Sequence, residues 1–349
     1  MINGVYKKMK KKLLIVYTGG TIGMKKSPDG WIPASGFLKE LMNENRVFRN
    51  EVMPDFDILE LEPLLDSSDM SPDDWVKIAK VIEQHYTDYQ GFVVLHGTDT
   101  MAYTASALSF MLEGLEKPVI LTGSQIPMML PRNDATENII GAMLFAANHE
   151  IPEVCVFFDN ILLRGCRTQK VNAEGFRAFE SPNLPPLGIG GIHIKINRNI
   201  VFRSEMDTNG LTVQSQLDTR VGVLWLFPGI TGEIVKNYLR PPIKGVVIQA
   251  FGSGNGPVSN QAFIQALTEA NDRGVVLVDC TQCTVGTVLL ADYATGTGMA
   301  RAGLVSGYDM TPEAALTKLA YLLGKGYSPE EVKQWMNTNM RGEMTVSMT

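Results

Sequence analysis

Short apolar runs alternate with amphipathic stretches along most of the 349 residues. The runs long enough for buried strands are residues 12–17, 91–96, 118–122, 153–158, 221–227, 245–250 and 274–279. Helical stretches lie between them at residues 99–115, 138–148, 231–239 and 260–272. Because strands that alternate with helices form β-α-β units, this pattern predicts an α/β fold with largely parallel sheets.

Three further helix starts are marked by a hydroxyl followed by proline. Ser71 precedes Pro72 and two aspartates, Ser328 precedes Pro329 and two glutamates, and Thr311-Pro-Glu follows the same pattern. A hydroxyl at the N-cap, proline in the first turn and nearby acidic residues all stabilise the start of a helix. We therefore expect one helix to begin at each of these three places.

The segment at residues 197–220 is more polar than its flanks and lacks a helical period. We interpret residues 199–220 as a linker between an N-terminal domain at 1–198 and a C-terminal domain at 221–349. A chain of this length is long enough for two separate cores. The sequence thus predicts two α/β domains, a larger N-terminal one with a mostly parallel sheet and a smaller C-terminal one.

The composition is that of a soluble globular protein, with 45% apolar and 19% charged residues. A net charge of −6 without a basic stripe argues against nucleic acid as a partner. No apolar window is long enough to span a membrane. Lysines cluster before Leu13, as in a signal peptide, but the apolar run at 13–16 is too short and no cleavage site follows. We expect a cytoplasmic protein, for which Met9 is an alternative start to Met1.

The cysteines and histidines do not predict a metal or redox site. Cys280 and Cys283 match C-x-x-C, but they end an apolar run instead of opening a helix, and Cys155 and Cys166 are loosely spaced. The four histidines show no ligand spacing. We expect neither a metal nor a cofactor.

Residues 13–24 combine a buried strand with a sharp turn. Gly19 and Gly20 end the apolar run, Gly23 follows, and Thr18 and Thr21 flank the glycine pair. Glycines let the backbone turn and bring main-chain N–H groups close to a small molecule. A threonine hydroxyl there is a candidate nucleophile for a carbonyl whose developing charge those N–H groups stabilise. The glycine spacing fits neither the Rossmann nor the P-loop pattern.

A second stretch of the same kind lies at residues 91–109, where Thr98 and Asp99 follow the strand. Ligands gather beyond the carboxyl ends of parallel strands, so Thr21, Thr98 and Asp99 are expected at one edge of a sheet. The alternative is that Thr98 or Asp99 only caps the helix that begins near Thr100.

A threonine nucleophile needs a proton acceptor near neutral pH. His96 is one candidate, although a strand-like His96 would point into the sheet layer. Lys170, which follows another strand end, is the other candidate, unless it is an ordinary solvated loop lysine.

A third polar cluster precedes the Ser71 helix. Asp66, Ser67 and Ser68 suit the ammonium and carboxylate of an amino acid, but the same residues also suit a simple turn and cap.

The two threonine motifs together resemble those of the bacterial-type L-asparaginases. They read Tyr17-Thr-Gly-Gly-Thr-Ile-Gly23 and Leu95-His-Gly-Thr-Asp-Thr-Met101. The likeness continues through residues 66–69, 121–127 and 164–170 to the carboxyl end, and without a signal peptide the chain is similar to the cytoplasmic type I branch. The resemblance implies two α/β domains with the site in the first, assembled as a homodimer or homotetramer.

The resemblance also implies a reaction, the hydrolysis of L-asparagine to L-aspartate and ammonia through an acyl-enzyme. Thr21 matches the primary nucleophile, while Thr98, Asp99 and Lys170 match the second catalytic group. Whether Thr21 or Thr98 forms the first covalent bond stays open. Backbone N–H groups near Thr98 are implied to form the oxyanion hole.

Two binding sites follow from the same resemblance. The residues implied to hold the substrate's amino and carboxylate groups are Thr98, Asp99, Asp66, Ser67 and Ser68. Type I relatives also bind asparagine at a regulatory site, which corresponds here to Gln249, Asn255, Thr281 and Cys283. Gln249 stands where a cation for the ligand's carboxylate is expected.

Residues 24–33 are polar and rich in turn residues, and we expect them to form a mobile lid. Relatives commonly place a tyrosine there as a hydrogen-bond partner of the first threonine, and the position with that spacing is Trp31. An indole N–H donates but cannot accept a proton. Three explanations for Trp31 stay open: another tyrosine takes over the hydrogen bond, the base lies elsewhere, or the role of the tyrosine in relatives is steric.

Two other functions fit the same motifs. One is a different amidase specificity, either glutamine hydrolysis or an amidotransferase subunit, although the lack of an extra N-terminal domain argues against the latter. The other is a sensor that binds asparagine or aspartate without releasing ammonia. A single methylene discriminates by only about 1–3 kcal/mol, so the preference for asparagine over glutamine is not readable from sequence.

Overall fold

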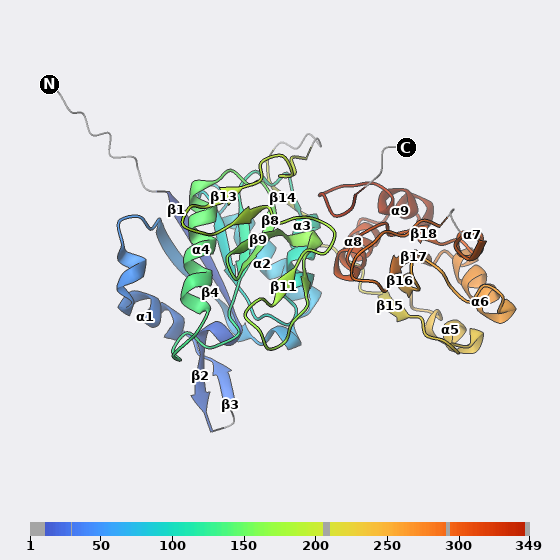
Figure 1. The fold of residues 1–349 in the computed structure, drawn as a ribbon, viewed down its shortest axis with the longest axis horizontal. Helices are drawn as coiled ribbons and strands as arrows, with labels where there is room; N and C mark the ends of the chain where they lie inside the picture. Colours follow the sequence, from blue (N-terminus) through green and yellow to red (C-terminus); the bar gives the residue numbers. More distant parts are fainter. Residues whose placement is uncertain (1–10, 29, 205–209, 291–293, 346–349) are drawn as a thin grey trace.

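The protein has two α/β domains, each built on its own sheet (Figure 1). The computed structural model describes residues 11–28, 30–204, 210–290 and 294–345. The lysine cluster before Lys11 and the alternative start at Met9 lie outside these residues. The predicted α/β fold class, with a larger N-terminal and a smaller C-terminal domain, is confirmed.

The N-terminal sheet has the strand order β13-β12-β9-β8-β7-β5-β1-β4. Strands β4, β1, β5, β7 and β8 run parallel, and β9, β12 and β13 extend the sheet in antiparallel fashion. The bounds are β1 Lys12–Gly19, β4 Asp55–Leu65, β5 Phe92–Leu95, β7 Val119–Thr122, β8 Val154–Phe158, β9 Ile161–Arg164, β12 Gly188–Ile189 and β13 Lys195–Ile196.

Helices cover both faces of this sheet. On β1, Leu13 and Ile15 pack with α1 (Phe37–Glu44) and α4 (Ala135–Asn148), whereas Leu14 and Val16 pack with α2 (Pro72–Gln84) and α3 (Met101–Met111). Alternate side chains of a strand point to opposite faces, so a central strand between two helical layers is apolar throughout. This is why β1, β5, β7 and β8 read as continuous apolar runs.

The C-terminal sheet is fully parallel, in the order β15-β16-β17-β18. One face packs with α5, α6 and α7, and the other with α8 and α9. The bounds are β15 Val221–Trp225, β16 Gly245–Ala250, β17 Val276–Thr281, β18 Val305–Ser306, α5 Gly232–Tyr238, α6 Gln261–Asp272, α7 Ala294–Arg301, α8 Pro312–Gly324 and α9 Pro329–Met336.

The three predicted helix starts are confirmed. Helices α2, α8 and α9 begin at Pro72, Pro312 and Pro329, with Ser71, Thr311 and Ser328 as their N-caps. In α2 the backbone N–H and hydroxyl of Ser71 both donate to Asp74, at 3.0 and 2.8 Å.

The two domains meet where α8 packs against α3. The rings of Phe110 on α3 and Tyr321 on α8 lie 6.0 Å apart, and the Tyr321 hydroxyl donates to Glu113 at 2.6 Å. Helix α3 ends at Met111, earlier than the predicted Leu115, because Leu112–Glu113 forms a short strand, β6. Its partner β14 (Thr212–Val213) lies in the predicted linker, of which residues 205–209 are outside the described part.

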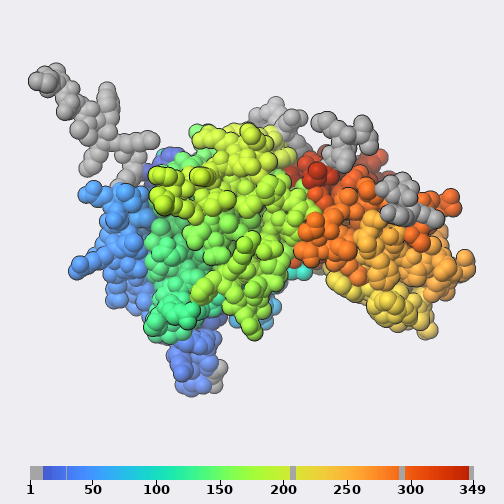
Figure 2. Space-filling view, viewed as in Figure 1, coloured from blue at the N-terminus to red at the C-terminus, as the bar shows by residue number. Residues whose placement is uncertain are grey.

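The predicted lid contains a β-hairpin of β2 (Met24–Ser27) and β3 (Gly30–Pro33), which projects from the N-terminal domain (Figures 1 and 2). Trp31 lies on β3 opposite Lys26, with 39% of its surface exposed. The remaining short elements are η1 Thr21–Gly23, η2 Arg46–Arg49, η3 Ser67–Asp69, η4 Gly165–Arg167, β10 Gln169–Lys170 and β11 Phe179–Glu180. Within the described ranges, no helix combines the length and apolar character needed to cross a bilayer.

Candidate active site

The N-terminal sheet has a topological switch point between β1 and β5. The chain leaves β1 for β4 on one side, and leaves β5 for β7 on the other. Crevices for ligands form at such points, beyond the carboxyl ends of the strands. Thr21 follows β1, and Thr98 and Asp99 follow β5, so the predicted residues lie at this switch point.

Two glycines let the turn after β1 pack against its neighbours. Gly19 (φ +120°) and Gly20 (φ +82°) have the backbone conformation that side chains rarely adopt. A Cβ on Gly20 would lie 2.4 Å from the backbone N of Gly97, and one on Gly19 would lie 2.1 Å from the carbonyl oxygen of Leu65. Only glycine permits this approach, which brings the turn carrying Thr21 against the turn carrying Thr98.

The two threonines of the first motif have different roles. Thr18 is fully buried, and its hydroxyl donates to the carbonyl oxygen of Leu95 at 3.0 Å. It therefore ties β1 to β5. Thr21 opens η1 and is partly exposed, so of the two it is the one available to a ligand.

The structure brings Thr98, Asp99 and Lys170 together. The Lys170 Nζ donates to Thr98 Oγ1 at 2.9 Å and to Asp99 Oδ1 at 2.6 Å. The Lys170 side chain is 17% exposed and that of Asp99 is 62% exposed, so Lys170 is not a solvated loop lysine. Neither Thr98 nor Asp99 is the helix cap, because Thr100 is the N-cap of α3, and its side chain makes no capping hydrogen bond.

Gln125, which lies in the stretch 121–127 but was given no role from the sequence, also contacts this group. Its Oε1 accepts a hydrogen bond from Thr98 Oγ1 at 3.0 Å, and its Nε2 donates to the carbonyl oxygen of Gly175 at 3.1 Å. The backbone N–H of Gln125 donates to the carboxylate of Asp134 at 3.0 Å. Thr98 thus accepts from Lys170 and donates to Gln125, which fixes the orientation of its hydroxyl.

His96 is a buried structural residue and not the proton acceptor. Its Nδ1–H donates to the carbonyl oxygen of Gly97 at 2.7 Å, and its Nε2 accepts from the Thr104 hydroxyl at 2.8 Å. Complete burial lowers the pKa of His96 to about 4, so the ring is neutral at physiological pH. Both nitrogens are occupied in joining the turn after β5 to α3.

The Asp66–Ser68 cluster lies beside the Thr98 turn. Ser67 is buried, and its carbonyl oxygen accepts from the Thr100 hydroxyl at 2.7 Å. A Cβ on Gly97 would lie 2.4 Å from the Ser67 hydroxyl, so the two turns are in contact. Asp66 accepts from the backbone N–H and hydroxyl of Ser68, each at 2.9 Å, which orients its carboxylate.

The residues of the predicted regulatory site gather at the carboxyl ends of β16 and β17. Gln249 is buried and lies opposite Cys280, and Thr281 lies opposite Ala250. The Thr281 hydroxyl accepts from the backbone N–H of Cys283 at 3.0 Å, and the Asn255 side chain accepts from Thr295. Cys283 is exposed and Cys280 buried, and all four cysteines are free. In the described part of the chain, no group of three acidic, histidine or cysteine side chains is placed to hold a metal.

Asp279, next to this cluster, is a buried carboxylate that destabilises the fold as pH rises. It is fully buried, and neither side-chain oxygen has a hydrogen-bond partner among the described residues. Burial raises its pKa from 3.8 to about 7. The folded state therefore binds the proton more tightly than the unfolded state, so stability is lost as pH rises toward and through 7.

We expect the stability of Asp279→Asn relative to the wild type to rise by about 3 kcal/mol between pH 5 and pH 8, because only the wild type loses stability as this carboxyl ionises. Asparagine keeps the shape and removes the charge. Urea titrations of both proteins at the two pH values measure this. An equal effect at both values would mean that the Asp279 carboxyl does not titrate in this range.

A hydroxyl held by a lysine beside a carboxylate, at the switch point of the sheet, is a group of side chains that occurs in the active sites of hydrolases. Comparison with known proteins agrees. The family model for the asparaginase N-terminal domain matches residues 12–202, and that for the glutaminase/asparaginase C-terminal domain matches residues 220–336. The chain belongs to the asparaginase family.

The similarity extends over nearly the whole chain. L-asparaginase 1 of Escherichia coli K12 is 51% identical over 96% of this chain and 98% of its own. The crystal structure of L-asparaginase I from Vibrio cholerae is 48% identical, with a TM-score of 0.89 over 97% of this chain and 100% of that one. A mouse protein named 60 kDa lysophospholipase is 47% identical over 97% of this chain and 63% of its own.

Proposed function

We propose that the protein is an L-asparaginase that hydrolyses L-asparagine to L-aspartate and ammonia. The observation that carries this proposal is the hydrogen bond of Lys170 to Thr98 beside Asp99, with the Thr21 turn packed against the Thr98 turn. Membership of the asparaginase family and the names of the E. coli and V. cholerae relatives support it.

The proposed mechanism has two acyl-transfer halves. The Thr21 hydroxyl attacks the side-chain amide carbon, and backbone N–H groups near Thr98 stabilise the oxyanion. The C–N bond then breaks, and the proton from Thr21 leaves with the nitrogen as ammonia. Water attacks the acyl-enzyme, the bond to Thr21 breaks, and the threonine regains a proton as aspartate leaves.

Lys170 and Thr98 form the proposed proton route. A charged ammonium only donates, so Thr98 accepts from it and gives its own hydrogen to Gln125. When its amine is uncharged, Lys170 accepts the proton of Thr98 while Thr98 takes that of Thr21, and the resulting ammonium returns the proton through Thr98 to the leaving nitrogen. Positioned acid–base help of this kind contributes about 10²–10⁴ in rate. Trp31 needs no part in it.

We further propose that Asp66 and Asp99 bind the substrate's ammonium, and that Ser67 and Ser68 bind its carboxylate. The contact of the two turns and the fixed carboxylate of Asp66 support this placement. The β2–β3 hairpin is proposed to act as the lid over this pocket.

Four further proposals concern the whole chain. The domains are residues 1–198 and 221–349, joined by the linker at 199–220. The protein is a homodimer or homotetramer. It is cytoplasmic, a proposal that fits the place of the apolar run 13–16 in the buried strand β1. Asparagine is proposed to bind a second, regulatory site at Gln249, Asn255, Thr281 and Cys283.

Ammonia release from L-asparagine and L-glutamine, with binding measured calorimetrically, tests the function. We expect turnover of asparagine. A pocket distinguishes substrates that differ by one methylene by about 10- to 200-fold in kcat/KM, so the ratio of the two kcat/KM values measures the preference for asparagine over glutamine. Binding of asparagine without ammonia release would instead establish the sensor. The same rate curves test regulation, since strictly hyperbolic dependence on asparagine contradicts a second site.

A further inference from the structure

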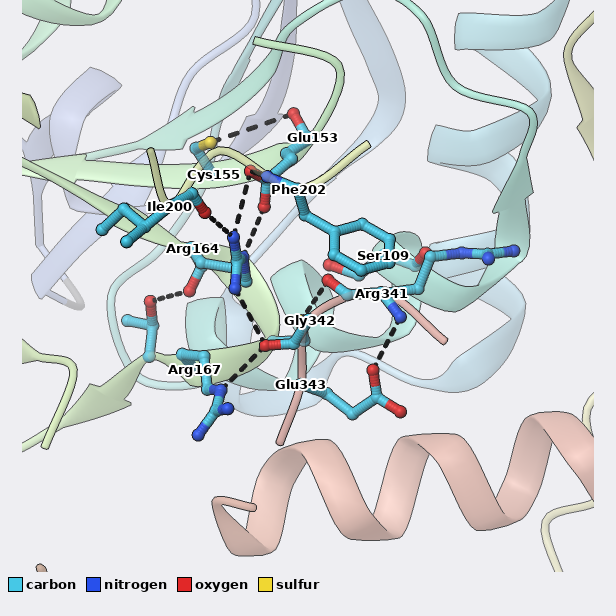
Figure 3. Close-up of polar contacts among 12 residues, drawn as sticks. Ser109, Glu153, Cys155, Arg164, Arg167, Ile200, Phe202, Arg341, Gly342 and Glu343 are labelled. Carbon is cyan, nitrogen blue, oxygen red and sulfur yellow. Dashed lines mark hydrogen bonds and ion pairs between the residues drawn. The ribbon is translucent and has the colours of Figure 1, made fainter. Parts of the chain in front are cut away.

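The C-terminal segment at residues 340–345 returns to the N-terminal domain after α9. There the carbonyl oxygen of Gly342 accepts hydrogen bonds from Arg164 Nη1 at 3.0 Å and Arg167 Nε at 2.8 Å. Figure 3 shows both guanidinium groups converging on this one carbonyl. Arg167 also donates to the Thr345 hydroxyl at 3.1 Å. Two arginines of the N-terminal domain therefore hold one backbone segment that is more than 170 residues away in sequence.

Both arginines are buried and paired with carboxylates. Arg164 donates from Nε and Nη2 to Glu153 at 2.5 and 3.3 Å, and its side chain is 6% exposed. Arg167 lies 2.8 Å from Asp309 of the C-terminal domain, with its side chain 2% exposed. A buried, paired guanidinium with several fixed partners has little freedom to move. We call Arg164, Arg167 and Gly342 the clamp.

The clamp lies immediately before the strand that carries Lys170. Arg164 ends β9, Arg167 ends η4, and β10 follows with Gln169 and Lys170. The buried Thr168 hydroxyl donates back to the Arg164 carbonyl oxygen at 2.7 Å, which fixes the turn between them. Gln169 then donates to Glu313 on α8 at 3.2 Å. The backbone leading to Lys170 is thus anchored on the C-terminal domain at three successive points.

We propose that the clamp positions the Lys170 amine against Thr98, so that the C-terminal domain sets the geometry of the proton route. The proposal rests on the function proposed above, since it requires Lys170 to take part in the reaction. Lysine has a flexible four-carbon stem, so the position of its amine depends on how firmly its backbone is held. A displacement of about 1 Å at a reacting group can cost about 10² in rate.

Gly342→Ala tests the clamp, with Gly326→Ala as its matched control. Gly342 has φ +78°, and a Cβ there would lie 2.4 Å from Arg164 Nη1. Gly326 has φ +77°, and a Cβ there would meet nothing within 4 Å. Both variants carry the same backbone strain, but only Gly342→Ala pushes on the clamp.

We expect Gly342→Ala to lower kcat for ammonia release by about 10- to 100-fold with a smaller change in KM. The pH profile of kcat should also move from that of the wild type, since the displaced amine has different contacts. Gly326→Ala should keep the wild-type kcat and profile. Rates are normalised to the folded fraction, measured by circular dichroism, so that a purely structural loss does not count.

Arg167→Lys keeps a cation beside Asp309 but loses the Nε hydrogen bond to Gly342. This variant tests the clamp if Gly342→Ala does not fold. A fall in kcat with a moved pH profile supports the clamp. Wild-type kcat and profile in the folded Gly342→Ala or Arg167→Lys protein, or equal losses in Gly342→Ala and Gly326→Ala, would overturn it. If the wild type releases no ammonia, the proposed function itself has failed, which is a separate result.

Discussion

Replacing Thr21 with alanine should lower kcat for ammonia release from L-asparagine by about 10⁴-fold or more. The loss of a nucleophile from a preorganised site commonly has an effect of this size, because the oxyanion donors and the binding contacts that remain supply only a residual rate. Thr21 is the partly exposed threonine at the switch point, on a turn that abuts the Thr98 turn. The measurement is steady-state ammonia release at saturating asparagine.

Thr18→Val is the matched control, because it removes a hydroxyl three residues away from Thr21. That hydroxyl is fully buried and donates to Leu95, so its loss should cost about 1 kcal/mol of stability and leave kcat within about threefold. Thr98→Val distinguishes the two possible first attacks. Activity that survives in Thr21→Ala and is lost in Thr98→Val would assign the first covalent bond to Thr98.

The elements buried on both faces were predictable from sequence. The predicted strand 245–250 coincides with β16, and the strands predicted at 91–96 and 118–122 contain β5 and β7. The three helix starts marked by proline were predicted as well, and that of α2 was predicted to the residue. These features depend on local composition, because burial between two helical layers demands an uninterrupted apolar run.

Edge elements were missed, since their patterns are weaker. Strand β4 alternates polar and apolar residues and contains Pro63, which an edge strand tolerates and a central one does not. The antiparallel strands β12 and β13 have two residues each, too few for any period. The hairpin of β2 and β3 lies in a polar stretch that reads as a loop.

The site was predictable where a motif carries its chemistry. The structure joins Thr98, Asp99 and Lys170, which the motifs single out. Gln125 was not identified, because a glutamine in a polar loop has no signature of its own. Arg164 and Arg167 lie 178 and 175 positions before Gly342 in the sequence, and a local sequence pattern does not predict contacts between residues so far apart in the chain.

The other large effect is expected at Lys318 and Glu343, an ion pair that joins α8 to the same C-terminal segment. Both side chains are fully buried, with Nζ and Oε1 2.5 Å apart. Burial alone would raise the pKa of Glu343, but the Lys318 ammonium and the backbone N–H groups of Met340 and Arg341 hold that pKa below its usual value. Glu343→Gln leaves the ammonium buried without a counterion, and we expect it to lower the free energy of unfolding by about 3–5 kcal/mol.

A double-mutant cycle separates the unpaired charge from the lost contact. In Lys318→Met/Glu343→Gln neither side chain of the pair is charged, so the double variant should be more stable than Glu343→Gln alone, with a coupling of about 2 kcal/mol or more in urea titrations. The partly exposed pair Lys80–Glu83 lies at a similar distance, 2.8 Å, and Glu83→Gln should cost less than about 1 kcal/mol. Additive losses at Lys318 and Glu343 would show that the pair does not stabilise the segment. Coupling there, together with a fall in kcat in Glu343→Gln, would mean that one buried ion pair stabilises the segment whose Gly342 carbonyl anchors the clamp.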